Sequence, residues 1–109
     1  MAVDINPIVK QILDTAADKG GEAWNKVQKG APLYVKGYAQ SLADIAEAVV
    51  SGDMTVEEGK SHAHTAELLL VQGLAFTSQV VLFEIQAFID GVLATLKGAI
   101  NAKLPVAIL

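Results

Sequence analysis

Apolar residues recur at alternating steps of three and four through the second half of the chain. The series runs Leu68, Val71, Ala75, Ser78, Leu82, Ile85, Ile89, Val92, Leu96 and Ala99, with Ser78 as its one polar member. This is the spacing of a helix face that packs on another helix. No proline interrupts the stretch before Pro105, so the pattern predicts one long helix over about residues 56–102, roughly 70 Å long at 1.5 Å per residue.

A capping box marks the start of this helix. The Thr55 hydroxyl is placed to accept a hydrogen bond from the third helical amide, while Glu58 reaches back to the Thr55 amide. Farther along, the polar residues gather in one narrow stripe of Thr65, Gln72, Gln79, Gln86, Asp90, Lys97 and Asn101, interrupted by Phe76, Phe83 and Ala94. A helix that is apolar around most of its circumference must be buried on several sides or lie in lipid.

Two shorter amphipathic helices precede the long one, over about residues 7–28 and 32–50. Gly30 and Pro32 separate them, because glycine suits a helix end and proline suits a first turn. Gly20 and Gly21 would ordinarily end the first helix. However, charged residues recur every four positions through this pair, at Lys10, Asp14, Asp18, Glu22 and Lys26. They share one exposed face only if the helix continues, so the row predicts a continuous helix with a bend at the glycines.

The connection between the second and third helices is short, at residues 51–53, which predicts an antiparallel hairpin. No strand pattern or internal repeat appears. The chain is therefore predicted to be one all-α domain over residues 1–109, built as a three-helix chain. Residues 104–109 are uncharged and aliphatic, and we expect them to dock in a groove of this chain or of a neighbouring copy.

Composition narrows the classes of function. The 109 residues are 52% hydrophobic and 18% charged, which is less charge than is usual for soluble domains and favours aliphatic helix packing. The net charge is −4, so no basic field attracts nucleic acid. Cysteine is absent, which excludes disulfides and thiolate chemistry. The first ten residues do not resemble a signal peptide, and this favours a cytoplasmic or particle-associated location.

One cluster of side chains suits metal chemistry, at Glu58, His62, His64 and Glu67. Glu58 and His62 share one helix face, as do His64 and Glu67, so each pair could present a carboxylate and an imidazole to a metal ion. His62 and His64 point about 200° apart and cannot bind one ion from a single helix. The alternative interpretation is a polar first turn with two surface histidines. No nucleophile or phosphate-binding motif is present, so no enzyme activity, cofactor or small-molecule substrate is predicted.

Glu84 and Asp90 are the acidic residues inside the apolar run. If the long helix is buried, each needs a partner or water, because an isolated buried carboxylate is costly. Asp90 lies on the polar stripe with Lys97 seven residues later, which indicates a hydrated or interchain polar seam. Glu84 stands off that stripe, and its simplest interpretation is a structural pair with a lysine of another helix.

The leading functional hypothesis is a non-enzymatic structural or interaction protein that self-associates. Two short helices cannot cover a rod of about 70 Å, so a large apolar strip would stay exposed without a partner. The predicted homo-oligomer interface is the seam of Leu68, Val71, Ala75, Leu82, Ile85, Ile89, Val92 and Leu96. Such a subunit could serve as a small component of a larger particle.

Two other hypotheses remain open at this point. The first is a membrane-active or pore-forming helical protein, since residues 68–83 carry no charge. That stretch is shorter than the roughly 20 residues of a spanning helix, and its extension admits Glu84 and Asp90. The second is a metal-binding helical bundle that brings the Glu58/His62 and His64/Glu67 pairs together across a symmetry axis.

Overall fold

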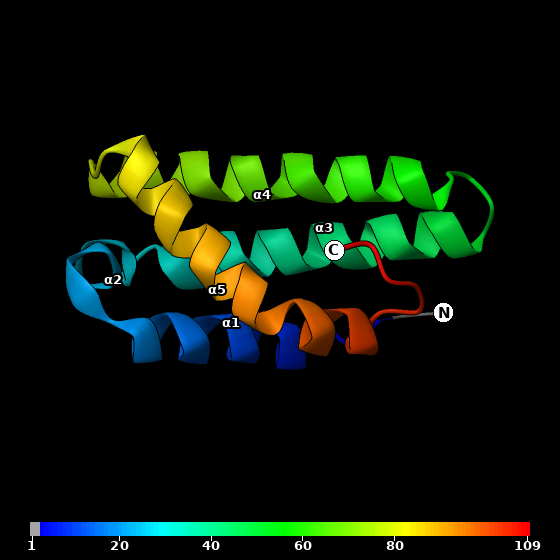
Figure 1. Ribbon diagram of the computed structural model, residues 1–109, viewed down its shortest axis with the longest axis horizontal. Coiled ribbons are helices and arrows are strands. Elements are labelled where there is room, and N and C mark those ends of the chain that lie inside the picture. Colours follow the sequence, from blue (N-terminus) through cyan, green and yellow to red (C-terminus); the bar gives the residue numbers. More distant parts are fainter. Residues whose placement is uncertain (1–2) are drawn as a thin grey trace.

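The computed structural model describes residues 3–109, which form an all-α fold (Figure 1). Its five helices are α1 (Asn6–Lys19), α2 (Gly21–Val27), α3 (Ala31–Val50), α4 (Val56–Ser78) and α5 (Leu82–Lys103). The predicted all-α class is confirmed. Helices α3 and α4 lie side by side as the predicted antiparallel hairpin, α1 lies along the other side of α3, and α5 crosses from the end of α4 to α1.

The prediction of one helix over residues 7–28 is wrong, because the chain turns at the glycine pair. Gly20 and Gly21 have φ of 59° and 82°, values that glycine adopts readily and other residues avoid. The charge row does not hold the helix together. Within the part of the chain that the structure describes, it contributes one ion pair, Lys10 to Asp14 at 2.9 Å, and both side chains are exposed.

The prediction of one long helix over residues 56–102 is also wrong, because α4 and α5 are separate helices joined by an elbow at residues 79–81. Gln79 takes the left-handed conformation with φ of 58°, and its N–H donates to the Ala75 carbonyl at 2.9 Å. The Ser78 hydroxyl donates to the Leu74 carbonyl at 2.6 Å and accepts from the Val80 amide at 3.4 Å. These bonds end α4 without glycine or proline. Because the chain turns here, the longest dimension of the molecule is 41 Å, shorter than the single helix of roughly 70 Å that was predicted.

The start of α4 is formed by the predicted capping box. The Glu58 amide donates to Thr55 Oγ1 at 3.1 Å, and the Thr55 amide donates to Glu58 Oε1 at 3.0 Å. Gly59 follows, at a point where α4 packs tightly against α3. A Cβ added there would lie 2.8 Å from Val49 Cγ2 and 3.3 Å from Ile108 Cγ2, so only glycine permits this approach.

The core lies between α1, α3, α4 and α5, and each of these helices turns one apolar face toward it. The largest fully buried side chains are Ile8, Ile12, Leu42, Val71, Leu74, Ile85, Val92, Ile100 and Ile108. The elbow is what brings the α5 members of this set back onto the rest of the chain. Burial of the apolar face of α5 therefore takes place within one chain.

Residues 104–109 fold back onto their own chain, as one of the two predicted alternatives states. Asn101 holds them. Its Oδ1 accepts from the amides of Ile108 at 3.3 Å and Leu109 at 3.1 Å, and its Nδ2 donates to the Leu109 carbonyl at 3.3 Å. Ile108 is 1% exposed and packs near Gly59 of α4.

Candidate functional site

Within residues 3–109 of one chain, the two predicted metal-binding pairs do not come together. Glu58 is held by the capping box, and the backbone hydrogen bond from Thr55, followed by the Thr55 hydroxyl, lowers the pKa of its carboxyl. His62 and His64 are both exposed on α4. Across residues 3–109, no three His, Asp or Glu side chains lie close enough together to hold a metal ion.

Glu67 instead pairs across helices, with Asp90 of α5. Both carboxyl groups line the same cavity. Partial burial of Glu67, followed by hydrogen bonding to Asp90 and by the charge of Asp90, raises the pKa of Glu67 to about 7. Asp90 was expected on a polar seam with Lys97, and the cross-helix partner was not anticipated.

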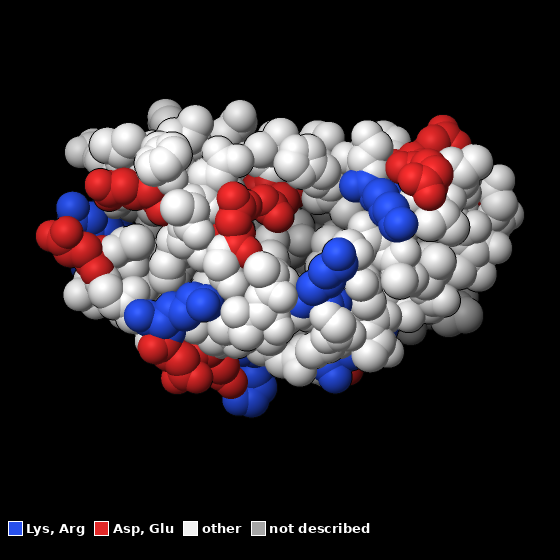
Figure 2. Space-filling model, viewed as in Figure 1, with Lys and Arg blue, Asp and Glu red and all other residues white. Residues whose placement is uncertain are grey.

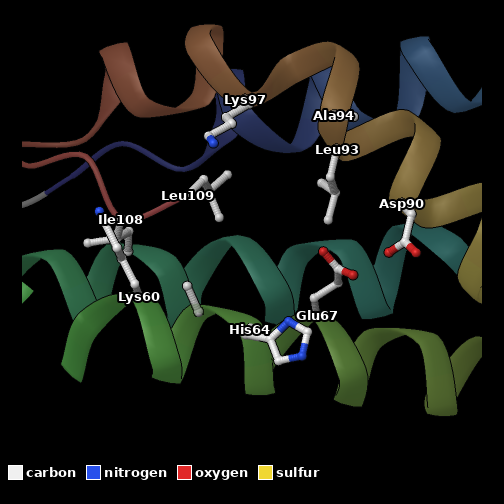
Figure 3. Close-up of a pocket in the computed structure, with 10 residues that line it drawn as sticks. Lys60, His64, Glu67, Asp90, Leu93, Ala94, Lys97, Ile108 and Leu109 are labelled. Carbon is white, nitrogen blue, oxygen red and sulfur yellow. The ribbon is translucent and has the colours of Figure 1, made fainter. Parts of the chain in front are cut away.

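This carboxyl pair lies on one side of a cavity of about 400 Å³ between α4, α5 and residues 104–109 (Figure 3). The lining residues are Lys60, Ala63, His64, Glu67, Asp90, Leu93, Ala94, Lys97, Ile108 and Leu109. The two helices leave the elbow in diverging directions, and the C-terminal segment occupies the gap between them (Figure 1). The cavity is the part of the space between α4 and α5 that residues 104–109 do not fill.

A buried tyrosine lies behind the carboxyl pair. Tyr38 of α3 is 3% exposed, and its hydroxyl has no hydrogen-bond partner among residues 3–109. Burial, followed by the negative charge of Glu67, raises the pKa of this hydroxyl. Tyr38 therefore stays neutral and presents no charge to the cavity.

The raised pKa of Glu67 predicts a pH-dependent stability. An acid whose pKa is higher in the folded protein than in the unfolded chain stabilises the fold fully below the unfolded value of about 4.5, and this contribution is lost as pH rises through about 7. We expect Glu67→Gln, which keeps a hydrogen-bond donor and removes the charge, to raise the free energy of unfolding above pH 7 by about 1 kcal/mol after allowance for solvent screening. Below about pH 5 the variant and the parent should differ little.

Urea unfolding of both proteins across this pH range checks the expectation. Glu57→Gln, at an exposed position in the first turn of α4, serves as the control. The expectation fails if the difference between Glu67→Gln and the parent does not change with pH.

The predicted oligomer interface lies largely inside the chain. Val71, Ile85, Ile89, Val92 and Leu96 are buried in its own core, whereas Leu68 and Ala75 are half-buried and Leu82 is 47% exposed. An association between copies therefore has to use other side chains. Glu84, expected in a buried pair, is exposed in the first turn of α5, where its charge suits the positive helix terminus.

Large apolar side chains are exposed at the elbow. We define the elbow surface as Phe76, Val81, Leu82 and Phe83, which are 85%, 64%, 47% and 78% exposed. In Figure 2 the upper left edge of the molecule, at the elbow, carries no Lys, Asp or Glu, whereas charged groups lie below it and at the upper right. In the sequence, this surface is indicated by Phe76 and Phe83, which interrupt the polar stripe. The predicted oligomer interface did not include either residue.

No protein-family model, no curated protein and no solved structure matches this chain. Within residues 3–109, none of the helices is both long enough and apolar enough to cross a membrane.

Proposed function

We propose that this protein is a non-enzymatic interaction protein that self-associates through the elbow surface. The observation that carries the proposal is the exposure of Phe76 and Phe83, at 85% and 78%, within one eight-residue segment at one end of the molecule. A phenylalanine side chain buries about 150–250 Å² when it is covered, so the two rings alone offer a few hundred Å² of apolar surface. Apolar patches of this size on small proteins commonly mark interaction sites.

A second copy of the chain is the partner that we favour. The elbow surface contains no charged residue, so it offers a like copy nothing to repel, and a two-fold axis through it would place each ring against the same patch of the partner. Two such patches bury about 1,000 Å² in total, near the lower limit of specific interfaces. We therefore expect a weak dimer with a dissociation constant in the micromolar range. Such a dimer would suit a small component of a larger particle.

The experiment is sedimentation velocity across a dilution series from millimolar to sub-micromolar protein. The parent should shift from dimer to monomer, and Phe76→Gln combined with Phe83→Gln should remain monomeric and weaken association at least about tenfold. Both substitutions act on exposed side chains, so thermal stability should stay close to that of the parent.

Val50→Gln is the matched control. Val50 is 53% exposed and is the last residue of α3, at the end of the molecule away from the elbow. It should leave the dimer unchanged. A parent protein that stays monomeric at millimolar concentration, or a double variant that dimerises as the parent does, contradicts the proposal.

A further inference from the structure

The cavity between α4, α5 and residues 104–109 has opposite charges at its two ends. Lys60 and Glu67 are seven residues apart on α4, and Asp90 and Lys97 are seven residues apart on α5. Seven residues are close to two helical turns, so each pair shares a helix face with a separation of about 10 Å along the axis. Because the chain reverses direction at the elbow, the two acids lie at one end of the cavity and the two lysines lie toward the other (Figure 3).

The wall between these ends is apolar. Ala63 of α4, Leu93 and Ala94 of α5, and Ile108 and Leu109 of the C-terminal segment line it. A volume of about 400 Å³ lies within the range of small-molecule pockets, which typically combine apolar walls with a few placed polar groups. None of the elbow-surface residues contributes to it, so this site is separate from the proposed self-association.

We propose that this cavity binds a linear zwitterion of the ω-amino acid class. Its ammonium group would lie against Glu67 and Asp90, its carboxylate would lie toward Lys60 and Lys97, and its methylene chain would cover the apolar wall. The binding is non-covalent, and it matches each charge of the ligand to a charge of opposite sign.

The acidic end explains the preference for an ammonium group. Glu67 and Asp90 both line this end of the cavity, and two ionised carboxylates there favour a positive species between them. An ammonium group supplies three donors and satisfies both carboxylates. Binding would release the proton of Glu67, and the raised pKa of Glu67 indicates that this release becomes easier as pH rises through neutrality.

The other titratable groups that line the cavity with Glu67 are Lys60, His64, Asp90 and Lys97. Tyr38 behind the pair stays neutral, because its pKa is raised. The raised pKa of Glu67 predicts tighter binding at about pH 8 than at about pH 6.

Isothermal titration calorimetry with 8-aminooctanoate tests the proposal on the intact protein. Octanoate lacks the ammonium, octylamine lacks the carboxylate and 4-aminobutyrate is too short to reach both ends, so each should bind at least about tenfold more weakly. Titration in buffers of different ionisation enthalpy should show proton release on binding of 8-aminooctanoate near neutral pH.

Glu67→Gln and Lys97→Gln should each weaken binding of 8-aminooctanoate about tenfold or more, and Glu67→Gln should also abolish the proton release. Glu57→Gln, on α4 but outside the cavity, should bind as the parent does. The proposal is overturned if 8-aminooctanoate gives no binding at millimolar concentration, if octanoate or octylamine binds equally well, or if the cavity variants bind as tightly as Glu57→Gln.

Discussion

Replacing Ile85 with aspartate is expected to leave most of the protein unfolded. Ile85 is 0% exposed in the first turns of α5, and it belongs to the core shared with α1, α3 and α4. Truncation of such a residue to alanine typically costs about 2–5 kcal/mol, and a buried carboxylate without a partner adds a desolvation cost. The sum exceeds about 5 kcal/mol, which is comparable with the whole stability of a small domain.

Ala87→Asp is the matched control, because it introduces the same side chain two residues away on the exposed face of α5. Circular dichroism with thermal melting should show a cooperative transition for Ala87→Asp near that of the parent and little or no transition for Ile85→Asp. Equal melting temperatures for the two variants would mean that Ile85 is not on the buried face of α5, and they would contradict the core within one chain.

The sequence was sufficient to locate those elements whose ends depend on local chemistry. The capping box of Thr55 and Glu58 predicts the start of α4, and the short link at residues 51–53 predicts the α3–α4 hairpin, and both predictions are confirmed. In each case the determining residues lie within a few positions of one another. Local hydrogen bonds and turn lengths are readable in such a segment without knowledge of the rest of the fold.

The elbow was not predictable in the same way, because it is stabilised by contacts between α5 and distant parts of the chain. A left-handed conformation at Gln79 costs about 1–2 kcal/mol, and no glycine or proline at residues 78–81 announces it. Folding α5 back buries Ile85, Ile89 and Val92 against the rest of the chain. Each such side chain contributes about 1.5–3 kcal/mol when buried, so the turn is strongly favoured once α1 and α4 are in place.

The candidate site was missed for the same reason. Spacing along one helix associated Glu67 with His64 and Asp90 with Lys97, and all four residues do line the cavity. The decisive pairing of Glu67 with Asp90 runs between α4 and α5 and exists only because the elbow reverses the chain. Helical periodicity identifies residues that share a face, but it does not determine which faces meet.

The C-terminal segment depends on one side chain, and replacing Asn101 with alanine is expected to release it. Three hydrogen bonds join the Asn101 amide group to Ile108 and Leu109. At about 0.5–1.5 kcal/mol each, their loss should lower the free energy of unfolding by about 2–3 kcal/mol. The two backbone amides would also lose their acceptor. Moving the segment into water would restore hydrogen bonds to these amides, and it would expose Ile108.

Asn25→Ala provides the control, because Asn25 is exposed on α2 and its side chain makes no hydrogen bond within residues 3–109. Urea unfolding should separate the two variants by about 2 kcal/mol. Amide hydrogen exchange of Ile108 and Leu109 should accelerate in Asn101→Ala far more than exchange in the middle of α3, since local release precedes global unfolding. If these two amides stay as protected as in the parent, apolar packing of Ile108 rather than the Asn101 hydrogen bonds holds the segment in place.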